Sequence, residues 1–167
     1  ENTNWLGRGS AYHRFDVPGT GLLFPSYLLN HSFRDCDTFV SLAKLKDHTT
    51  TGVTLSMKNG FGNIPTTIYG DHVPKDQPDQ LPHSGRVRVF HEGARQPARL
   101  AAPEIDPTSP RHEGYRIPRV VVDICAARPI DLAIIDGVES MGGAEGPWGG
   151  GESCHPGVLV AGTNCVN

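Results

Sequence analysis

The stretch DTFVSLAKLKDHTTTGVTLSMKNG, residues 37–60, decides how this chain is expected to fold. Its first part, residues 37–43, is short and rich in apolar and β-branched side chains, which is typical of a strand. A helix is expected to begin at Thr50 or Thr51, because threonine is a good helix cap, and to run through Asn59. The stretch therefore predicts a strand, a polar turn and a helix, in that order.

The strongest helix signal lies later in the chain. Apolar residues at positions 117, 120, 121, 124 and 125 recur at the helical period, with Pro118 at the start and Pro129 as the stop. The other expected elements are a short strand near residues 13–17, a helix over 25–33, a short strand or hairpin arm over 86–90, and buried strands at 132–135 and 158–161.

The order of these elements predicts a single α/β domain over residues 1–167, with a mainly parallel sheet and flanking helices. The 167 residues suffice to bury a core, and 20 Gly and 14 Pro indicate long Gly/Pro-rich loops around it. Ligands of parallel sheets bind beyond the carboxyl ends of the strands. The residues that follow Ala43 and Ile135 are therefore expected to meet at one end of the sheet.

Composition excludes some classes of function. The net charge of −3 provides no general field for nucleic acid. No apolar run approaches the roughly 20 residues that cross a bilayer, so no membrane span is expected, and no signal peptide is visible. The four cysteines lack C-x-x-C spacing, which disfavours a cysteine-only zinc or iron–sulfur site. Cys125 is expected in the core. The sequence does not decide whether Cys154 and Cys165 form a disulfide.

The use of lysine in residues 37–60 stands out. The sequence has 4 Lys and 11 Arg, and Lys44, Lys46 and Lys58 all lie in this stretch. Lysine changes its pKa readily on burial and can act as a nucleophile, whereas arginine does neither. Lys44 and Lys46, with the amides of a helix that starts near Thr51, are expected to hold a phosphate or a carboxylate. A solvated basic loop explains the same residues.

Three side chains are candidate catalytic groups. His48 is a candidate acid, base or metal ligand. Asp136 follows a predicted buried strand and can bind a metal, orient a lysine or act as a base, and Lys58 can reach a shared ligand. The alternatives are a structural histidine, a surface lysine and an aspartate that turns the chain before Gly137. Further candidate ligand-binding residues are Thr51, Asn59, Glu139 and Glu145, and Trp148 is a candidate for closing over a ligand or for packing.

Four segments resemble one family. Residues 39–48 and 51–62 are similar to a strand with a PKLKTH-like turn and a TGVTLALKN-type segment. Residues 130–147 and 157–166 are similar to PDLAIVDGI-type and GVLLAGTDPVA-type segments. Together they resemble the bacterial and archaeal family named domain of unknown function 362, over roughly half of the chain.

The sequence departs from that pattern at a few positions. Ala43 stands where the family usually has Pro, and Asn164 and Cys165 stand where it often has Asp-Pro. The family pattern continues past the position of Asn167, so the chain is expected to be a fragment or processed part of a longer domain. Because members often occur beside ferredoxin-like modules and some carry export signals, the resemblance implies a metal ion or an iron–sulfur cluster in an associated module and leaves the compartment open.

Three hypotheses about function remain. The leading one is an α/β domain that binds an anionic small molecule or cofactor, with or without a metal, and with redox or isomerase chemistry as an option. The second is an electron-transfer partner domain beside an iron–sulfur module. The third is a structural or assembly protein whose Gly/Pro-rich loops are contact surfaces.

The apolar surface at the C-terminal end of the predicted sheet is expected to be buried against another polypeptide. Val158, Val160 and Val166 belong to a predicted last strand that no helix follows. A parallel sheet that is covered on one side only would leave apolar surface in water. Another chain or a second copy is therefore expected to cover this end.

Overall fold

The computed structural model describes residues 12–64, 69, 87–97, 100–146 and 149–165. They belong to two compact units, and each unit is built from two separated stretches of the chain. Unit 1 comprises Glu1–Cys36 and Asn63–Arg128, and unit 2 comprises Asp37–Gly62 and Pro129–Asn167. Among the described residues, no helix is long and apolar enough to cross a membrane.

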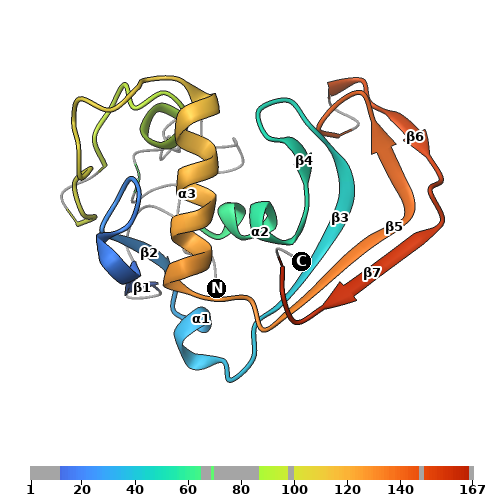
Figure 1. The fold of residues 1–167 in the computed structure, drawn as a ribbon, viewed down its shortest axis with the longest axis horizontal. Helices are drawn as coiled ribbons and strands as arrows, with labels where there is room; N and C mark the ends of the chain where they lie inside the picture. Colours follow the sequence, from blue (N-terminus) through green and yellow to red (C-terminus); the bar gives the residue numbers. More distant parts are fainter. Residues whose placement is uncertain (1–11, 65–68, 70–86, 98–99, 147–148, 166–167) are drawn as a thin grey trace, which may run out of the picture. The chain divides into compact units, whose positions relative to one another are not determined.

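Unit 1 begins with a two-stranded antiparallel sheet. Strands β1 (Tyr12–Asp16) and β2 (Ser26–Asn30) pair with Tyr12 opposite Asn30, and the short 3-10 turn η1 (Pro18–Thr20) lies between them (Figure 1). The predicted strand near residues 13–17 is confirmed.

The predicted helix over residues 25–33 is wrong. The segment forms β2 and a separate four-residue helix, α1 (Ser32–Asp35). The first four residues of β2 are all buried, so the segment has no exposed stripe of the kind that a surface helix shows. Pro25 and the apolar run suggested a helix, but the backbone groups of β1 supply hydrogen bonds that favour a strand.

The predicted helix around residues 117–125 is confirmed as α3 (Glu113–Ala127). It begins before Pro118, which lies inside the helix, and buries Ile117, Val120 and Ile124. The predicted strand over residues 86–90 is wrong, because residues Val87–His91 form a short π-helix, η3, and Arg86 lies outside the described residues. A five-residue alternation is too short to distinguish a strand from a helical turn.

Aromatic rings form the centre of unit 1. The Phe90 ring lies 4.7 Å from the Tyr69 ring and 5.5 Å from the Phe24 ring, between centroids, and it stacks on Tyr27 at 6.0 Å. All four side chains are buried. Such edge and stacked contacts add to the hydrophobic burial of the rings.

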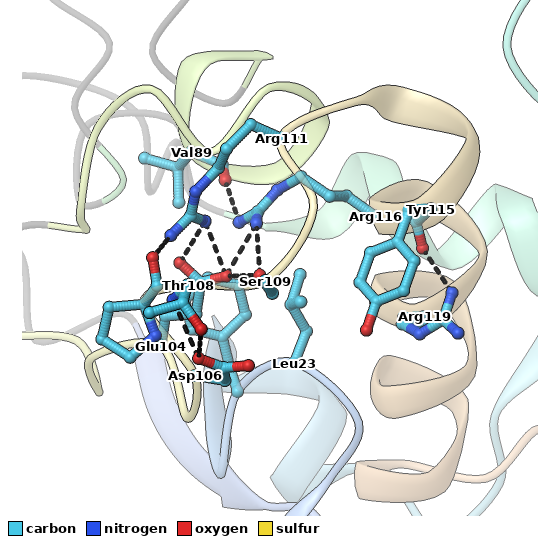
Figure 2. A network of polar contacts seen from close by, with 12 residues as sticks. Leu23, Val89, Glu104, Asp106, Thr108, Ser109, Arg111, Tyr115, Arg116 and Arg119 are labelled. Atoms are coloured by element: carbon cyan, nitrogen blue, oxygen red, sulfur yellow. Dashed lines mark hydrogen bonds and ion pairs between the residues drawn. The ribbon is translucent and has the colours of Figure 1, made fainter.

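Unit 1 also contains a buried ionic network, which Figure 2 shows from close by. Arg116 is fully buried and donates to Glu104 Oε1 at 2.7 Å and to the Val89 carbonyl at 2.9 Å. Arg111 donates to both Glu104 oxygens, at 2.8 and 2.6 Å. Burial opposes the ionisation of Glu104, but hydrogen bonds, from Arg116 first, outweigh it and lower its pKa to about 2.

A second buried carboxylate, that of Asp123 on α3, holds the loop before β2. It accepts hydrogen bonds from the main-chain amides of Leu22, Leu23 and Phe24 at 2.6, 2.9 and 3.3 Å, and from the Tyr27 hydroxyl at 3.0 Å. Burial, and next the charge of Asp123, raise the pKa of Tyr27 well above its ordinary value. The phenol therefore stays protonated and continues to donate.

Unit 2 is a five-stranded mixed sheet with the order β4-β3-β5-β6, and β7 also pairs with β5 (Figure 1). The α/β class is confirmed in the coarse sense, but the sheet is not mainly parallel. Among the described strands, β3 and β5 are the parallel pair, and the other pairings are antiparallel. The strands are β3 (Val40–His48), β4 (Gly52–Thr54), β5 (Leu132–Gly142), β6 (Glu152–Cys154) and β7 (Val158–Gly162).

The predicted helix from Thr50 or Thr51 to Asn59 is wrong. Strand β3 continues through His48 and turns tightly into β4, where Gly52 has a φ of +78° that favours glycine. The helical part is limited to α2 (Ser56–Asn59) and the 3-10 turn η2 (Gly60–Asn63). Because no helix starts near Thr51, no helix amides are present there to hold the anion that the sequence predicted at this place.

Strand β5 is longer than predicted and is irregular in its middle. Lys44 pairs with Asp136, but Lys46 pairs with Met141, so β5 carries extra residues between these two positions. Gly137 lies at this irregularity. A Cβ atom there would approach the side chains of Val158 and Leu45 to 2.8 and 2.9 Å, so a larger residue would push the neighbouring strands apart.

The strand at residues 158–161 is confirmed as β7, but its predicted burial is wrong. Val158, Leu159 and Val160 are all exposed, with Leu159 at 67%. Val166 lies outside the described residues. The four cysteines, all of them described, form no disulfide, and Cys125 is only half-buried.

Candidate functional site

Two lysines of β3 lie in one cleft of unit 2. Lys44 and Lys46 are two positions apart on the strand, so their side chains leave the same face. We call the cleft the lysine cleft; its volume is about 400 Å³. Its lining residues are Lys44, Lys46, Glu139, Ser140, Met141, Glu145, Gly146 and Ser153.

The Lys44 ammonium is paired with Asp136. Its Nζ atom lies 2.7 Å from Asp136 Oδ2, and the other carboxylate oxygen accepts the Val138 amide at 3.0 Å. The hydrogen bond from Lys44, followed by that from Val138, lowers the pKa of Asp136. Asp136 therefore pairs with Lys44 and also accepts a main-chain amide two residues further along β5.

Lys46, Thr49 and His48 surround Glu145. Lys46 Nζ donates to the main-chain carbonyl of Glu145, and the Thr49 hydroxyl donates to its carboxylate. His48 Nδ1 lies 3.6 Å from the same carboxylate, which is too long for a hydrogen bond. The Thr49 hydrogen bond lowers the pKa of Glu145, partial burial opposes it, and the charges of His48, Lys58 and Lys46 reinforce it.

His48 is nearly buried, and the turn after it fixes its orientation. Its Nδ1 atom accepts hydrogen bonds from the amides of Thr50 at 3.1 Å and Thr51 at 3.4 Å. A neutral His48 therefore carries its hydrogen on Nε2. His48 lines a second hollow of about 300 Å³, the histidine cavity, together with Asp47, Thr49, Gly52, Gly143 and Ala144.

The other expected site residues serve different purposes. The Asn59 amide donates to Ser41 Oγ at 3.4 Å and to the Leu42 carbonyl at 3.5 Å, which ties α2 to β3. The Thr51 hydroxyl donates to the Val53 carbonyl at 2.9 Å within the turn. Lys58 Nζ lies 4.6 Å from the centre of the Phe61 ring. None of these three residues lines the lysine cleft.

A family model matches residues 7–167, which is nearly the whole chain, and its description is "Domain of unknown function (DUF362)". The chain belongs to the DUF362 family. No curated protein and no solved structure is similar enough to the chain to support a comparison. Family membership therefore defines the chain's relatives without defining a reaction.

The DUF362-like segments are the ones that unit 2 brings together. Residues 39–48 supply β3, residues 130–146 supply β5 and the loop with Glu145, and residues 157–162 lie in and beside β7. Asp136 pairs with Lys44 in the middle of β3, whereas His48 is the last residue of that strand. Lys44, the partner of Asp136, precedes His48 by four residues, or roughly 13 Å along a strand. The candidate residues thus lie at different positions along the paired strands β3 and β5.

Sequence reasoning about this DUF362 chain missed some site residues. Thr49, Asp47 and Ser140 all belong to the surroundings of the two hollows, and Asp47 Oδ2 accepts the Gly143 amide at 2.7 Å. The only sequence signal for Thr49 and Asp47 was that they are the neighbours of the candidate residue His48. Within the described part of the chain, no three His, Cys, Asp or Glu side chains are grouped to hold a metal. Trp148 lies outside the described residues.

Proposed function

We propose that this DUF362 chain binds a small anionic molecule in the lysine cleft. The observation that carries the proposal is the convergence of Lys44 and Lys46 on one cleft whose walls also offer hydroxyl groups. Ammonium and hydroxyl groups together are donors that suit a carboxylate or a phosphate.

The distribution of charge in unit 2 supports this proposal. Residues 37–62 and 129–167 contain three Lys, no Arg and seven Asp or Glu, so their formal charge is 3 − 7 = −4. All three lysines act near the loop of Glu145: Lys44 and Lys46 line the lysine cleft, and Lys58 influences the Glu145 carboxyl. An acidic unit that gathers its few cations at one place has a local preference for anions there.

The two cleft lysines differ in how readily they can serve a ligand. Lys44 forms a half-exposed pair with Asp136, at 44% and 38% exposure, and such pairs contribute little to stability. An entering anion can therefore compete for Lys44 at small cost. Lys46 donates to the main-chain carbonyl of Glu145, and its charge also acts on the Glu145 carboxyl.

Titration calorimetry of the purified chain with inorganic phosphate and with succinate tests the proposal. We expect one of the two anions to bind, and Lys46→Gln to weaken that binding about tenfold, since a hydrogen bond to a charged group contributes about 1.5–3 kcal/mol. Arg119→Gln removes one positive charge from α3 in unit 1 and is the matched control. Binding that is absent, or equally weakened by both substitutions, would contradict the proposal.

An assembly role is the second candidate, and the exposed strand β7 favours it. Val158, Leu159 and Val160 expose apolar side chains on a strand whose described pairing is with β5 alone. Residues 158–162 contain no charge and no Pro, which are the usual protections of an edge strand. A second copy pairing through β7 would cover them.

Light scattering after size exclusion tests this second candidate. We expect a dimer of the wild-type chain, and a monomer after Leu159→Lys. Val122→Lys places the same charge at an exposed apolar position of α3 and should leave the dimer intact. A wild-type monomer at all concentrations would remove the assembly role.

A further inference from the structure

Glu145 occupies a position at which its surroundings would suit a ligand anion. Its carboxylate accepts the Thr49 hydroxyl, lies 3.6 Å from His48 Nδ1, and is within the electrostatic influence of Lys46 and Lys58. The side chain is one-third exposed, at 33%. A carboxylate of the chain itself thus fills the position where the donors and cations of unit 2 converge.

The backbone that carries Glu145 is fixed independently of its side chain. Lys46 holds the Glu145 carbonyl, and Asp47 holds the Gly143 amide at 2.7 Å. Both anchors lie on β3, whereas the carboxylate contacts Thr49 in the turn that follows. The side chain can therefore rotate away from Thr49 and His48 while the main chain stays in place.

The carboxylate also lies at the border of the two hollows. Glu145 and Gly146 line the lysine cleft, and the preceding Gly143 and Ala144 line the histidine cavity. From the lysine cleft, the Glu145 side chain reaches Thr49, a residue that lines the histidine cavity. A ligand that enters the lysine cleft would meet this carboxylate before it could contact Thr49 or His48.

We infer that the ligand of the lysine cleft carries a carboxylate group, which displaces the Glu145 carboxylate and takes over its hydrogen bond from the Thr49 hydroxyl. The inference rests on the proposed anion binding and specifies the class of anion. A carboxylate has the shape and single charge of the group that is already there. The Thr49 hydroxyl already donates to a carboxylate at this position, and the charges of Lys46 and Lys58 act on it.

If a ligand carboxylate has to displace the Glu145 carboxylate, the size of the effect on affinity can be predicted. If the Glu145 carboxylate occupies the position about nine-tenths of the time, it lowers the apparent affinity for a ligand carboxylate about tenfold. Removing the Glu145 carboxylate should therefore raise the apparent affinity for a ligand carboxylate about tenfold. The effect on succinate should exceed the effect on inorganic phosphate, because only the carboxylate reproduces the contacts that Glu145 gives up.

The experiment is titration calorimetry with succinate and with inorganic phosphate on the wild-type chain, Glu145→Gln and Glu139→Gln. Glu139 lines the same cleft and is 70% exposed, so Glu139→Gln reports the general effect of removing one negative charge. We expect Glu145→Gln to bind succinate about tenfold more tightly than wild type, and Glu139→Gln to gain much less. The double variant Glu145→Gln/Thr49→Val should lose most of the gain.

Other outcomes overturn the inference. An equal gain in Glu145→Gln and Glu139→Gln, or an equal gain for succinate and phosphate, would reduce the effect to general electrostatics. A loss of succinate binding in Glu145→Gln would make Glu145 part of the binding site rather than its competitor. Failure of the proposed function is distinguishable: in that case neither anion binds the wild type or Glu145→Gln, or Lys46→Gln has no effect.

Discussion

The two units handle charged side chains in opposite ways. In unit 1, Glu104 and Arg116 are 1% and 0% exposed at the side chain and share their partners with Arg111 and Ser109. In unit 2, Lys44 and Asp136 pair at a similar distance, but both are about two-fifths exposed. The distance between the charges is nearly the same, and their access to water is very different.

That difference separates a structural role from a functional one. A buried charge that loses its partner cannot recover hydration, so unit 1 depends on an intact network. An exposed pair exchanges one partner for water or for a ligand at little cost. The exposed Lys44–Asp136 pair of unit 2 can therefore be broken at little cost, whereas the buried contacts of unit 1 are suited to holding the fold.

Glu104→Gln should have the largest effect on stability. It leaves the fully buried Arg116 guanidinium without its carboxylate, and breaking a buried pair in this way costs about 3–5 kcal/mol. Urea unfolding followed by hydrogen exchange should show the loss in peptides of unit 1. Glu113→Gln, at an exposed position in the first turn of α3, is the control and should cost under about 1 kcal/mol. Equal effects of the two substitutions would contradict the contrast between buried and exposed charge.

Asp123→Asn should have a smaller effect. The amide group keeps one acceptor but places a donor against at least one of the donors that now face the carboxylate, and an unsatisfied buried group costs about 1–3 kcal/mol. The amides of residues 22–24 should then exchange faster in hydrogen exchange measurements. Unchanged protection at these amides would show that Asp123 does not hold the loop.

Acid should destabilise unit 1 through Glu104. Its pKa is lowered to about 2 in the folded chain from an ordinary value of 4.5. A group with a lowered folded pKa contributes stability that is fully present above its unfolded pKa and is lost as pH falls through the folded pKa. Unit 1 should therefore weaken between about pH 4.5 and 2, and Glu104→Gln should lack this part of the pH dependence. Parallel acid curves for the two chains would count against it.

Asp136→Asn should have the smallest effect on stability. The Lys44–Asp136 pair is half-exposed, and surface pairs of this kind contribute about 0–1 kcal/mol. Urea unfolding should therefore be close to wild type, and the difference should shrink further in high salt. A loss of several kcal/mol would mean that the pair is as structural as the buried network of unit 1.

The sequence predicted best where one signal was long or continuous. Helix α3 follows the helical period over many residues, and the core of β5 is a continuous apolar run. The predicted helices at residues 25–33 and 51–59 rested on local capping residues. Pairing with β1 in one case, and the tight turn at Gly52 in the other, supplied backbone hydrogen bonds that capping could not indicate.

The contacts of the candidate site can likewise be separated into those that the sequence pattern predicted and those that it did not. The proximity of Lys44 and Asp136 follows from parallel strands, whose successive residues stay in register, and the sequence pattern allowed that expectation. The contact of Thr49 with Glu145 depends on the path of a glycine-rich loop, which no periodic pattern specifies. The sequence pattern also did not predict the burial of Arg116 and Glu104, because isolated charged residues in a Pro-rich stretch usually lie on the surface.

The interleaving of the two units along the chain has a consequence for synthesis. Each unit consists of two separated stretches, and the parallel partners Lys44 and Asp136 are 92 positions apart. When β3 leaves the ribosome its neighbour β5 has not yet been made, so β3 must remain without that partner while most of unit 1 emerges. Closing so long a loop is slow, and unpaired strand edges invite association with other chains. No cut between adjacent residues can release one complete unit without dividing the other, so the family domain has to be produced, and tested, as one piece.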